Sequence, residues 1–395
     1  MAQDWLIEFL LGTGKLFLNP VFYMLCLLAA FLGVSRVKRE RRNFKVRVEN
    51  AYFELRQLVP IGLLVGVILS VIIVSVGVVI PFEAVILTSG ITLLLVLTTR
   101  VRLISPAYTL GLAIIALAVI DWQNWSLPYF SDFSLDTNGS LAAIILLGLL
   151  TVGEGIIILA NGPKGTSPKL IKGKRGHTVG VHELKRAWLL PVFLLIPGDV
   201  LQLPFSWWPV LSFGGETYSL LLVPFAVGIQ QQVQAMLPLA AVKLHGKRVV
   251  ILGVVTAILA AGVYFLPLAS IGIAAFVIIA REIITWIQCN NERNSPFYFS
   301  QQNNGLMILG VLLNSPASKM ELKVGEILTK VNGQTIHDEN SYYEALQRNG
   351  AHCKLEVLDV SGEVRFVQRA LYEGDHHELG LLFVQNEKKK GSKAV

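Results

Sequence analysis

Charged residues are scarce in this chain of 395 residues, because Asp, Glu, Lys and Arg together make up only 15% of it. Soluble globular domains carry roughly a quarter, so the composition argues against a soluble enzyme. Cysteine is scarcer still. The three cysteines, Cys26, Cys289 and Cys353, are too few for a disulfide scaffold. Hydrophobic residues instead make up 53% of the chain, and their long runs lie within residues 1–295.

Catalytic signatures are absent as well. A zinc metalloprotease needs H-E-x-x-H on a helix, so that two histidines hold the metal and the glutamate acts as base. Neither His182-Glu183 nor His376-His377-Glu378 has a second histidine at that spacing, and no G-x-S-x-G or G-x-x-x-x-G-K-[ST] motif occurs. We therefore expect a protein that is not an enzyme, with no catalytic residue, metal site, cofactor or nucleic-acid partner.

Several apolar runs approach the ~20 residues that a helix needs to cross ~30 Å of hydrocarbon. Some are marginal: 84–99 is short, and 188–208 is interrupted by Pro191, Pro197 and Asp199. The sequence thus predicts a multi-span α-helical membrane domain of seven to nine spans over residues 1–289. The candidate spans are 16–34, 58–80, 84–99, 103–120, 140–160, 188–208, 217–237, 249–266 and 267–281.

Basic residues cluster in alternate loops. Segment 35–57 holds eight and segment 161–187 holds seven, whereas 81–83 and 121–139 hold none. The positive-inside rule places the basic loops, and the C-terminal domain with them, in the cytoplasm. Residues 5–18 are either an interfacial helix or an extension of the first span. The densest basic run either fixes orientation alone or also forms a surface for lipid or a partner: Lys38, Arg39, Arg41, Arg42, Lys45 and Arg47.

Two carboxylates, Glu154 and Asp199, fall inside candidate spans. Ionisable residues within a membrane mark ion or proton pathways by default. A transporter or channel with a regulatory domain is therefore one alternative function. Each carboxylate also lies near a glycine, a proline or a span end, where a structural role competes with transport.

The last hundred residues have the pattern of a small soluble domain that is mostly β. Residues 290–304 read as a polar linker, and 305–385 contain short alternating strands with a helix over 341–348. Asn332-Gly333 between apolar runs predicts a tight turn. Residues 386–395 are expected to be a solvated basic tail within reach of lipid.

Three motifs in this domain resemble the bacterial kind of PDZ domain: V-x-x-x-S-P-A from Val311 to Ala317, L-K-V-G-E-I-L from Leu322 to Leu328, and Val331-Asn332-Gly333. Met320-Glu321 departs from the family, which commonly has Ala-Gly there. The loop that receives a ligand carboxylate usually precedes the first of these strands. Here its best match is Glu378-Leu379-Gly380-Leu381, so the resemblance implies that the last strand lines the groove in a permuted order.

Such a groove binds an extended peptide as one more strand, whose alternate side chains enter pockets beside a helix. Glycine leaves the backbone amides open to a terminal carboxylate. In the alternative, the groove holds an internal segment or the protein's own chain. The candidate peptide-binding residues are Tyr343, Gln347, Leu379, Gly380, Leu381 and Leu382.

Ser35 to Arg42, Leu103 to Thr109 and His377 to Val384, in this architecture, resemble the MinJ family of cell-division topological determinants. The resemblance implies an adaptor that bridges a DivIVA-like coiled-coil scaffold to a MinD-like ATPase. That ATPase carries MinC, the inhibitor of FtsZ assembly, and other divisome proteins and membrane lipids are further expected partners. Enrichment at septa and poles of the cell membrane is implied. An adaptor for a membrane protease or secretion system is another alternative.

Overall fold

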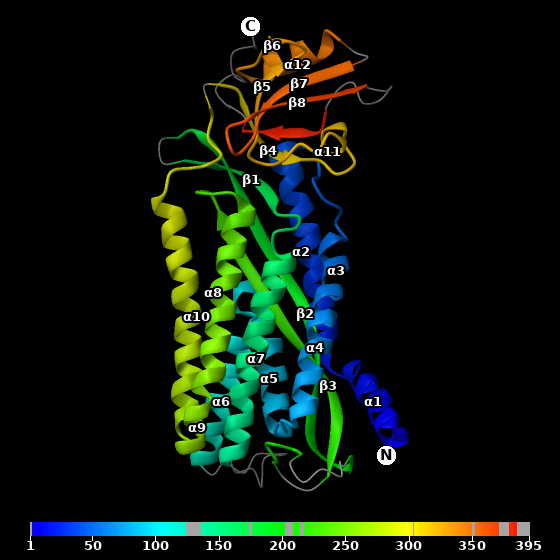
Figure 1. Ribbon diagram of the computed structural model, residues 1–395, viewed down its shortest axis with the longest axis vertical. Helices are drawn as coiled ribbons and strands as arrows, with labels where there is room; N and C mark the ends of the chain where they lie inside the picture. The colour runs from blue at the N-terminus through cyan, green and yellow to red at the C-terminus, as the bar shows by residue number, and fades with distance from the viewer. Residues whose placement is uncertain are drawn as a thin grey trace.

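The computed structural model describes residues 2–123, 136–173, 176–201, 208–213, 217–302, 304–349, 352–370 and 379–384. An elongated domain of near-parallel helices carries a small β-rich domain at one end, and helix α1 lies at the other (Figure 1). The predicted fold class, a multi-span helical membrane domain followed by a small, mostly β domain, is confirmed.

Six helical segments in the described residues are long and apolar enough to cross a membrane, and α5 is a shorter apolar helix. They correspond to seven of the predicted spans. Of the predicted segment 5–18, residues 5–16 belong to α1, and the last two lie in the turn before α2, where the Asn19 side chain caps α2. The helices are α1 (Ala2–Leu16), α2 (Pro20–Phe44), α3 (Phe53–Gln57), α4 (Pro60–Val76), α5 (Phe82–Leu97), α6 (Pro106–Gln123), α7 (Thr137–Asn161), α8 (Pro238–Leu259), α9 (Ala261–Phe265) and α10 (Ala269–Asn294).

Two predicted helical spans are wrong. Runs 188–208 and 217–237 contribute instead to β2 (Thr178–Leu201) and β3 (Tyr218–Val233), two long antiparallel strands. A strand buried on both faces is as continuously apolar as a membrane helix, so the runs alone do not distinguish them. Pro191 and Pro224 face each other across the hairpin. Inside a helix each would break the hydrogen-bond ladder, whereas a strand with an outer edge tolerates proline.

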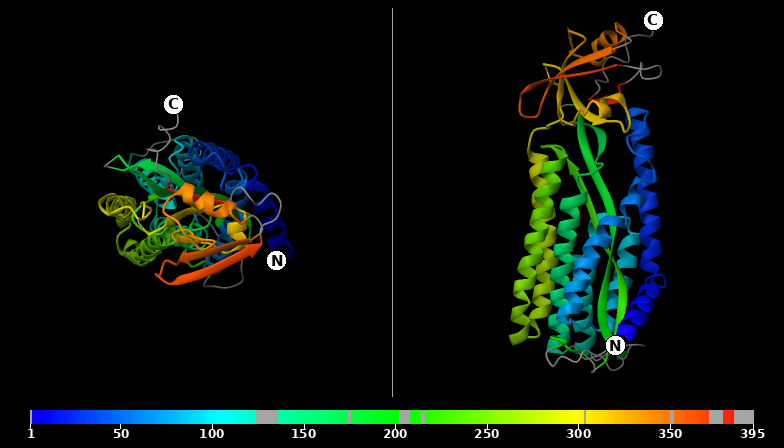
Figure 2. Two further views of the ribbon diagram at one scale, coloured as in Figure 1. Left: turned by 90° about the horizontal axis from the view of Figure 1, so that it is seen from above. Right: turned by 45° about the vertical axis from the view of Figure 1, so that its right-hand side comes forward.

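The hairpin runs lengthwise among the helices (Figures 1 and 2). Its regular pairing from His182 to Pro197 is about 50 Å long at ~3.3 Å per residue, whereas the 25-residue helix α7 is about 38 Å long at 1.5 Å per residue. The start of β2 therefore extends past the helices toward the β-rich domain, where it pairs with β1 (Ser167–Lys172).

Helix α4 and the segments directly before and after it form hydrogen bonds to the outer edge of β2. The Leu189 N–H donates to the Leu58 carbonyl at 2.9 Å, and the Phe193 N–H donates to Ser70 Oγ at 2.8 Å. Farther along, the Leu195 carbonyl accepts from the Ile80 N–H at 2.8 Å. Because lipid offers no hydrogen bonds, irregular backbone at membrane depth must be paired inside the protein. The bundle does this for the hairpin.

Helix α4 approaches β2 closely through two glycines spaced four residues apart. A Cβ added to Gly62 would lie 1.8 Å from the Leu189 carbonyl oxygen, and one added to Gly66 would lie 2.0 Å from that of Pro191. In membranes a small-xxx-small pattern usually joins two helices. Here the same pattern seats a helix against a strand.

The C-terminal domain contains a sheet in the order β8-β7-β5-β4-β9, with β6 paired to β5. The predicted strands, the helix near 341–348 and the tight turn are confirmed, with Asn332 and Gly333 at φ 50° and 82°. Its elements are β4 (Leu306–Val311), α11 (Pro316–Lys319), β5 (Ile327–Val331), β6 (Gln334–Thr335), α12 (Glu339–Gln347), β7 (His352–Leu358), β8 (Val364–Ala370) and β9 (Leu381–Phe383).

The predicted linker 290–304 is in part helical and in part packed, because α10 continues to Asn294 and Phe299 is fully buried. The Gly180 N–H donates to the Phe299 carbonyl at 2.9 Å. The C-terminal domain is thus seated on the end of the membrane domain. The apolar cluster between them includes Phe44, Val48, Phe299, Met307, Leu309 and Leu382.

Candidate peptide groove and basic surface

Strand β9 forms one end of the C-terminal sheet. It pairs with β4 through Ile308–Phe383, Gly310–Leu382 and Val311–Leu381, and no other described strand pairs with it. Helix α12 lies beside it, since the Tyr342 and Phe383 rings are 5.2 Å apart. An edge strand flanked by a helix is the arrangement that accepts a peptide by strand addition.

The structure describes the two residues directly before β9, Leu379 and Gly380. Gly380 has φ +80°, and a Cβ there would lie 2.3 Å from Ser315 Cβ, so this conformation requires glycine. The Leu379 and Gly380 carbonyls turn toward the domain, where they accept from the Ala317 and Leu312 N–H groups at 2.9 and 2.8 Å.

The six predicted groove residues divide between different surroundings. Gln347 is exposed, while Tyr343 and Leu381 are half-buried against the domain core. Leu379 is fully inside that core, and Leu382 faces the membrane domain. The Leu382 side chain therefore lies on the face of β9 opposite to that of Leu381, because neighbouring side chains of a strand point to opposite faces. The assignment of these six residues to a groove stays a prediction.

The basic run 38–47 lies mostly on the last two turns of α2. Lys38, Arg41 and Arg42 are exposed on the helix, and Lys45 and Arg47 are exposed just after it. Arg39 differs, because its Nη1 lies 2.9 Å from a Glu183 carboxylate oxygen and its side chain is mostly buried. Five of the six predicted residues therefore present charge to the surroundings.

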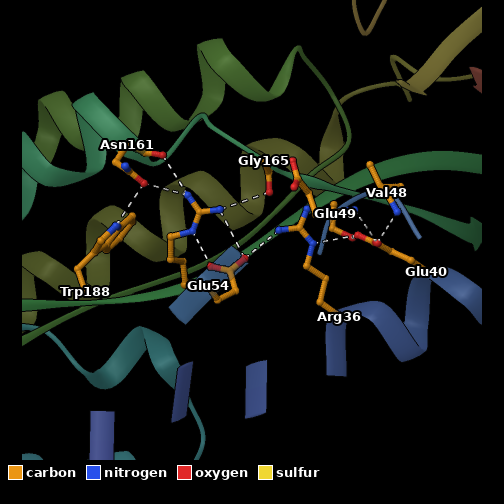
Figure 3. A network of polar contacts seen from close by, with 10 residues as sticks. Arg36, Glu40, Val48, Glu49, Glu54, Asn161, Gly165 and Trp188 are labelled. Atoms are coloured by element: carbon orange, nitrogen blue, oxygen red, sulfur yellow. Dashed lines mark hydrogen bonds and ion pairs between the residues drawn. The ribbon is translucent and has the colours of Figure 1, made fainter. Parts of the chain in front are cut away.

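Sequence reasoning missed a buried polar network next to this surface (Figure 3). Arg36 donates to Glu40 at 2.9 Å and to Glu54 at 2.8 Å, and Arg186 donates to Glu54 at 2.7 Å. Asn161 accepts from Arg186 through both its side-chain and its main-chain oxygens at 3.1 Å. The spacing of Arg36 and Glu40 by one helical turn was the one local signal.

This network connects elements that are far apart in the sequence. Glu40 on α2 also accepts from the Val48 N–H at 2.8 Å and from Ser167 Oγ of β1 at 2.7 Å. Arg186 of β2 lies over the Phe53 ring of α3 at 4.9 Å. Buried charges are tolerated only when paired and hydrogen-bonded, and here the pairing joins the hairpin to α2 and α3.

A buried histidine links the hairpin to the C-terminal domain. His182 Nε2 lies 2.9 Å from the Leu309 carbonyl oxygen and Nδ1 lies 3.0 Å from Thr166 Oγ1. The carbonyl requires Nε2 to donate, so Nδ1 accepts from the hydroxyl in the neutral ring. Burial is the main cause that lowers the pKa of His182 to about 4, although the Leu309 carbonyl acts in the opposite direction.

The similarities of the chain to known proteins agree with this geometry. A PDZ domain family model matches residues 307–359. The chain is 38% identical to the cell division topological determinant MinJ of Bacillus subtilis (strain 168) over 391 residues, 98% of each chain. This chain belongs to the MinJ family. Probable MinJ proteins of Lacticaseibacillus paracasei and Lacticaseibacillus casei (strain BD-II) are each 24% identical over 387 residues, 94% of this chain and 98% of theirs.

Membership in the MinJ family supports a role in division-site selection. The resemblances to a PDZ domain and to MinJ proteins are both confirmed. The PDZ match ends at residue 359, before β8 and β9. The permuted strand beside α12 thus lies outside the matched segment and was found through the Gly380 motif.

Glu154 has a structural setting in this MinJ-family chain. Its side chain is fully buried, one carboxylate oxygen accepts from Arg281 Nη2 at 2.8 Å, and the other accepts from Ser105 Oγ at 2.5 Å. These contacts join α7, α10 and the start of α6, which favours a packing role over ion transport. Asp199 lies in β2, and its side chain is outside what the structure describes.

Proposed function

We propose that the chain is a non-catalytic integral-membrane adaptor in division-site selection. It connects a DivIVA-like coiled-coil scaffold to a MinD-like ATPase, which carries the MinC inhibitor of FtsZ assembly. Concentration of the inhibitor at poles and new septa then leaves midcell as the place of division. Tethering several partners to one membrane raises their effective concentrations, so each contact can be weak.

The observation that carries this proposal is the similarity to MinJ over 98% of both chains. It covers the membrane domain and the C-terminal domain together, so the two parts are related as one unit. The candidate peptide groove, at the edge of β9 beside α12, and the exposed residues of the basic run 38–47 are two separate surfaces of this unit. We assign one partner to the groove and the other to the basic end of the membrane domain.

The basic end is placed in the cytoplasm by the positive-inside rule. Lys38, Arg41 and Arg42 lie at the same end as the C-terminal domain, because α2 ends against its Met307 and Leu309. Both partners would thus meet the adaptor on the cytoplasmic side. Other divisome proteins have access to the same face.

The first experiment is live-cell imaging of a fluorescent fusion of the full chain beside division markers, with cell length scored in a deletion strain. We expect enrichment at septa and poles, and filaments or minicells on deletion, because the inhibitor is no longer positioned. A uniform membrane signal with normal cell length would reject the proposal.

A second experiment separates the two surfaces. Gly380→Asp in the full chain places a charge and a side chain in the loop before β9, and we expect it to abolish recruitment of one partner while membrane insertion persists. Gly333→Asp is the matched control, since Gly333 also has positive φ but a Cβ there meets nothing within 4 Å. Equal recruitment by the two variants contradicts the groove assignment.

A further inference from the structure

A cavity of about 270 Å³ opens beside the buried network, and none of the six predicted groove residues lines it. It lies between α2, the turn after α5 and the first half of β2. Polar and apolar side chains share its wall. The lining residues are Phe31, Leu32, Ser35, Arg36, Arg39, Glu54, Thr99, Gly165, Ser167, Glu183, Leu184 and Lys185.

Two guanidinium groups in this wall have unused donors. Arg36 is 6% exposed, and its Nη2 has no hydrogen-bond partner among the described residues. Arg39 Nε is buried and equally without a partner in this part of the chain. A buried donor without an acceptor costs free energy, so these two atoms of cavity-lining residues call for an explanation such as an anion that the side chains turn to meet.

The carboxylates of the wall are already engaged. Glu54 accepts from Arg36 and Arg186, and Glu183 accepts from Arg39 and Lys169. The wall itself carries three cationic side chains against these two carboxylates, since Lys185 also lines it. The remaining hydrogen-bonding capacity of the two arginines therefore suits an anion with several acceptor oxygens.

The cavity lies where α2 changes from an apolar to a basic surface. Tyr23, Leu27, Phe31 and Val34 are exposed at helical spacing, and the same face continues with the exposed Lys38. Val34 and Lys38 are about 6 Å apart along the helix axis at 1.5 Å per residue. Such a change is expected at the boundary between acyl chains and headgroups.

The neighbouring helix changes at the same place. On α5, Leu94 and Leu97 are exposed apolar side chains, and Thr99 and Arg100 are exposed directly after the helix. Thr99 lines the cavity from this side. Two adjacent helices therefore pass from an apolar to a polar surface at the mouth of one basic cavity.

We propose that this cavity binds the phosphate group of an anionic phospholipid, with Arg36 and Arg39 donating to its oxygens. The acyl chains lie outside, along the face of α2 that carries Phe31. A volume of 270 Å³ is below the ~300–1,000 Å³ typical of sites for drug-sized ligands, so a headgroup fits and a whole lipid does not. Free phosphate shares the chemistry but lacks the chains.

The test uses the purified full chain in a nonionic detergent, titrated with phosphatidylglycerol, phosphatidylcholine or inorganic phosphate and followed by native mass spectrometry. We expect saturable retention of phosphatidylglycerol alone. Arg39→Gln should weaken it roughly tenfold, as expected for one lost charge-assisted hydrogen bond. Arg56→Gln is the matched control, with the same charge change on an exposed residue of α3 outside both the cavity and the basic run 38–47.

A steric variant guards against a general effect of charge or folding. Ser35→Phe keeps every charge and fills the cavity mouth, and it should weaken phosphatidylglycerol binding while the thermal midpoint without lipid stays unchanged. Equal phosphatidylglycerol binding by the Arg39→Gln, Ser35→Phe and Arg56→Gln proteins would overturn the site. Tight binding of inorganic phosphate that competes with the lipid would assign the cavity to a free anion instead.

Discussion

Buried ion pairs are the residue-scale feature that distinguishes this membrane domain. Glu154 with Arg281, and Glu54 with Arg36 and Arg186, are almost fully buried. Desolvation opposes each pair, and breaking one costs more than the pair itself contributes, because an uncompensated charge is left behind. These residues therefore constrain which elements can pack together.

Glu154→Gln should lower the free energy of unfolding by about 3 to 5 kcal/mol, the range for breaking a buried pair. The reason is that Arg281 would keep its buried charge without a counter-ion, although Ser105 could still donate to the amide oxygen. Thermal unfolding of the full chain in detergent measures the change.

The double variant Glu154→Gln/Arg281→Gln is the control, because it removes both charges at once. It should recover much of the stability that the single variant loses. If the single variant is as stable as the unmodified chain, the pair has no structural role, and an ion-transport role for Glu154 regains support.

His182 gives the molecule a pH dependence. Its pKa is about 4 in the folded protein against 6.5 for a free histidine, so the unfolded chain binds more protons between these values. The contribution of His182 to the free energy of unfolding is therefore complete above pH 6.5. It is lost as the pH drops toward 4, by up to about 3 kcal/mol.

The measurement compares thermal unfolding from pH 7 to pH 4 in three proteins, because acidic residues also titrate in this window. We expect His182→Gln to flatten the pH dependence relative to the unmodified chain. His177→Gln is the control, since His177 lies just before the same strand but is exposed. An identical pH dependence in all three would show that His182 does not sense pH.

At the scale of elements, the β2–β3 hairpin inside a helical membrane domain is the feature that sequence reasoning did not anticipate. Its register can be tested chemically. Val192 and Val223 are opposite each other and both are buried. Opposed residues of antiparallel strands have Cβ atoms about 4.5–5.5 Å apart, close to the geometry of a disulfide.

Val192→Cys with Val223→Cys should form a disulfide on oxidation, detected as a shift in nonreducing electrophoresis after cleavage between the strands. Val192→Cys with Val227→Cys is the control, offset by four residues or about 13 Å, and should not. Cys26 and Cys289 are first replaced by serine. Cys353 can remain, because burial raises its pKa to about 12 and keeps it a thiol. Equal crosslinking of both pairs is incompatible with the register.

At the scale of the whole molecule, the C-terminal domain and the basic run of α2 share one end, and α1 lies at the other (Figure 2). The positive-inside rule predicts that only the second end faces outward. We expect a membrane-impermeant maleimide to label the Asp4→Cys variant in intact protoplasts. The Arg41→Cys variant should be labelled only after permeabilisation, since both positions are exposed.

Both variants carry the Cys26 and Cys289 replacements, and labelling in lysed membranes confirms that each position reacts. Labelling of Arg41→Cys in intact protoplasts would reverse the orientation. In that orientation the groove and the basic run would lie outside the cell, where the proposed cytoplasmic partners could not bind them.

The sequence by itself determined the two-part architecture, the small domain and the family. Apolar runs of about twenty residues, the Asn332-Gly333 turn and the motifs around Val311 and Gly380 are local, so neighbouring residues suffice to encode them. The exposure of most of the basic run 38–47 could also be expected from the sequence, because the density of basic side chains is a local property.

The tertiary structure alone decided three matters, each of which depends on residues far apart in the chain. It showed that 188–208 contributes to a strand, because a partner strand and surrounding helices satisfy a backbone that lipid cannot. It paired Glu154 with Arg281, 127 positions away. It also turned Leu382 toward the membrane domain, because the face of an edge strand that becomes buried depends on what docks against it.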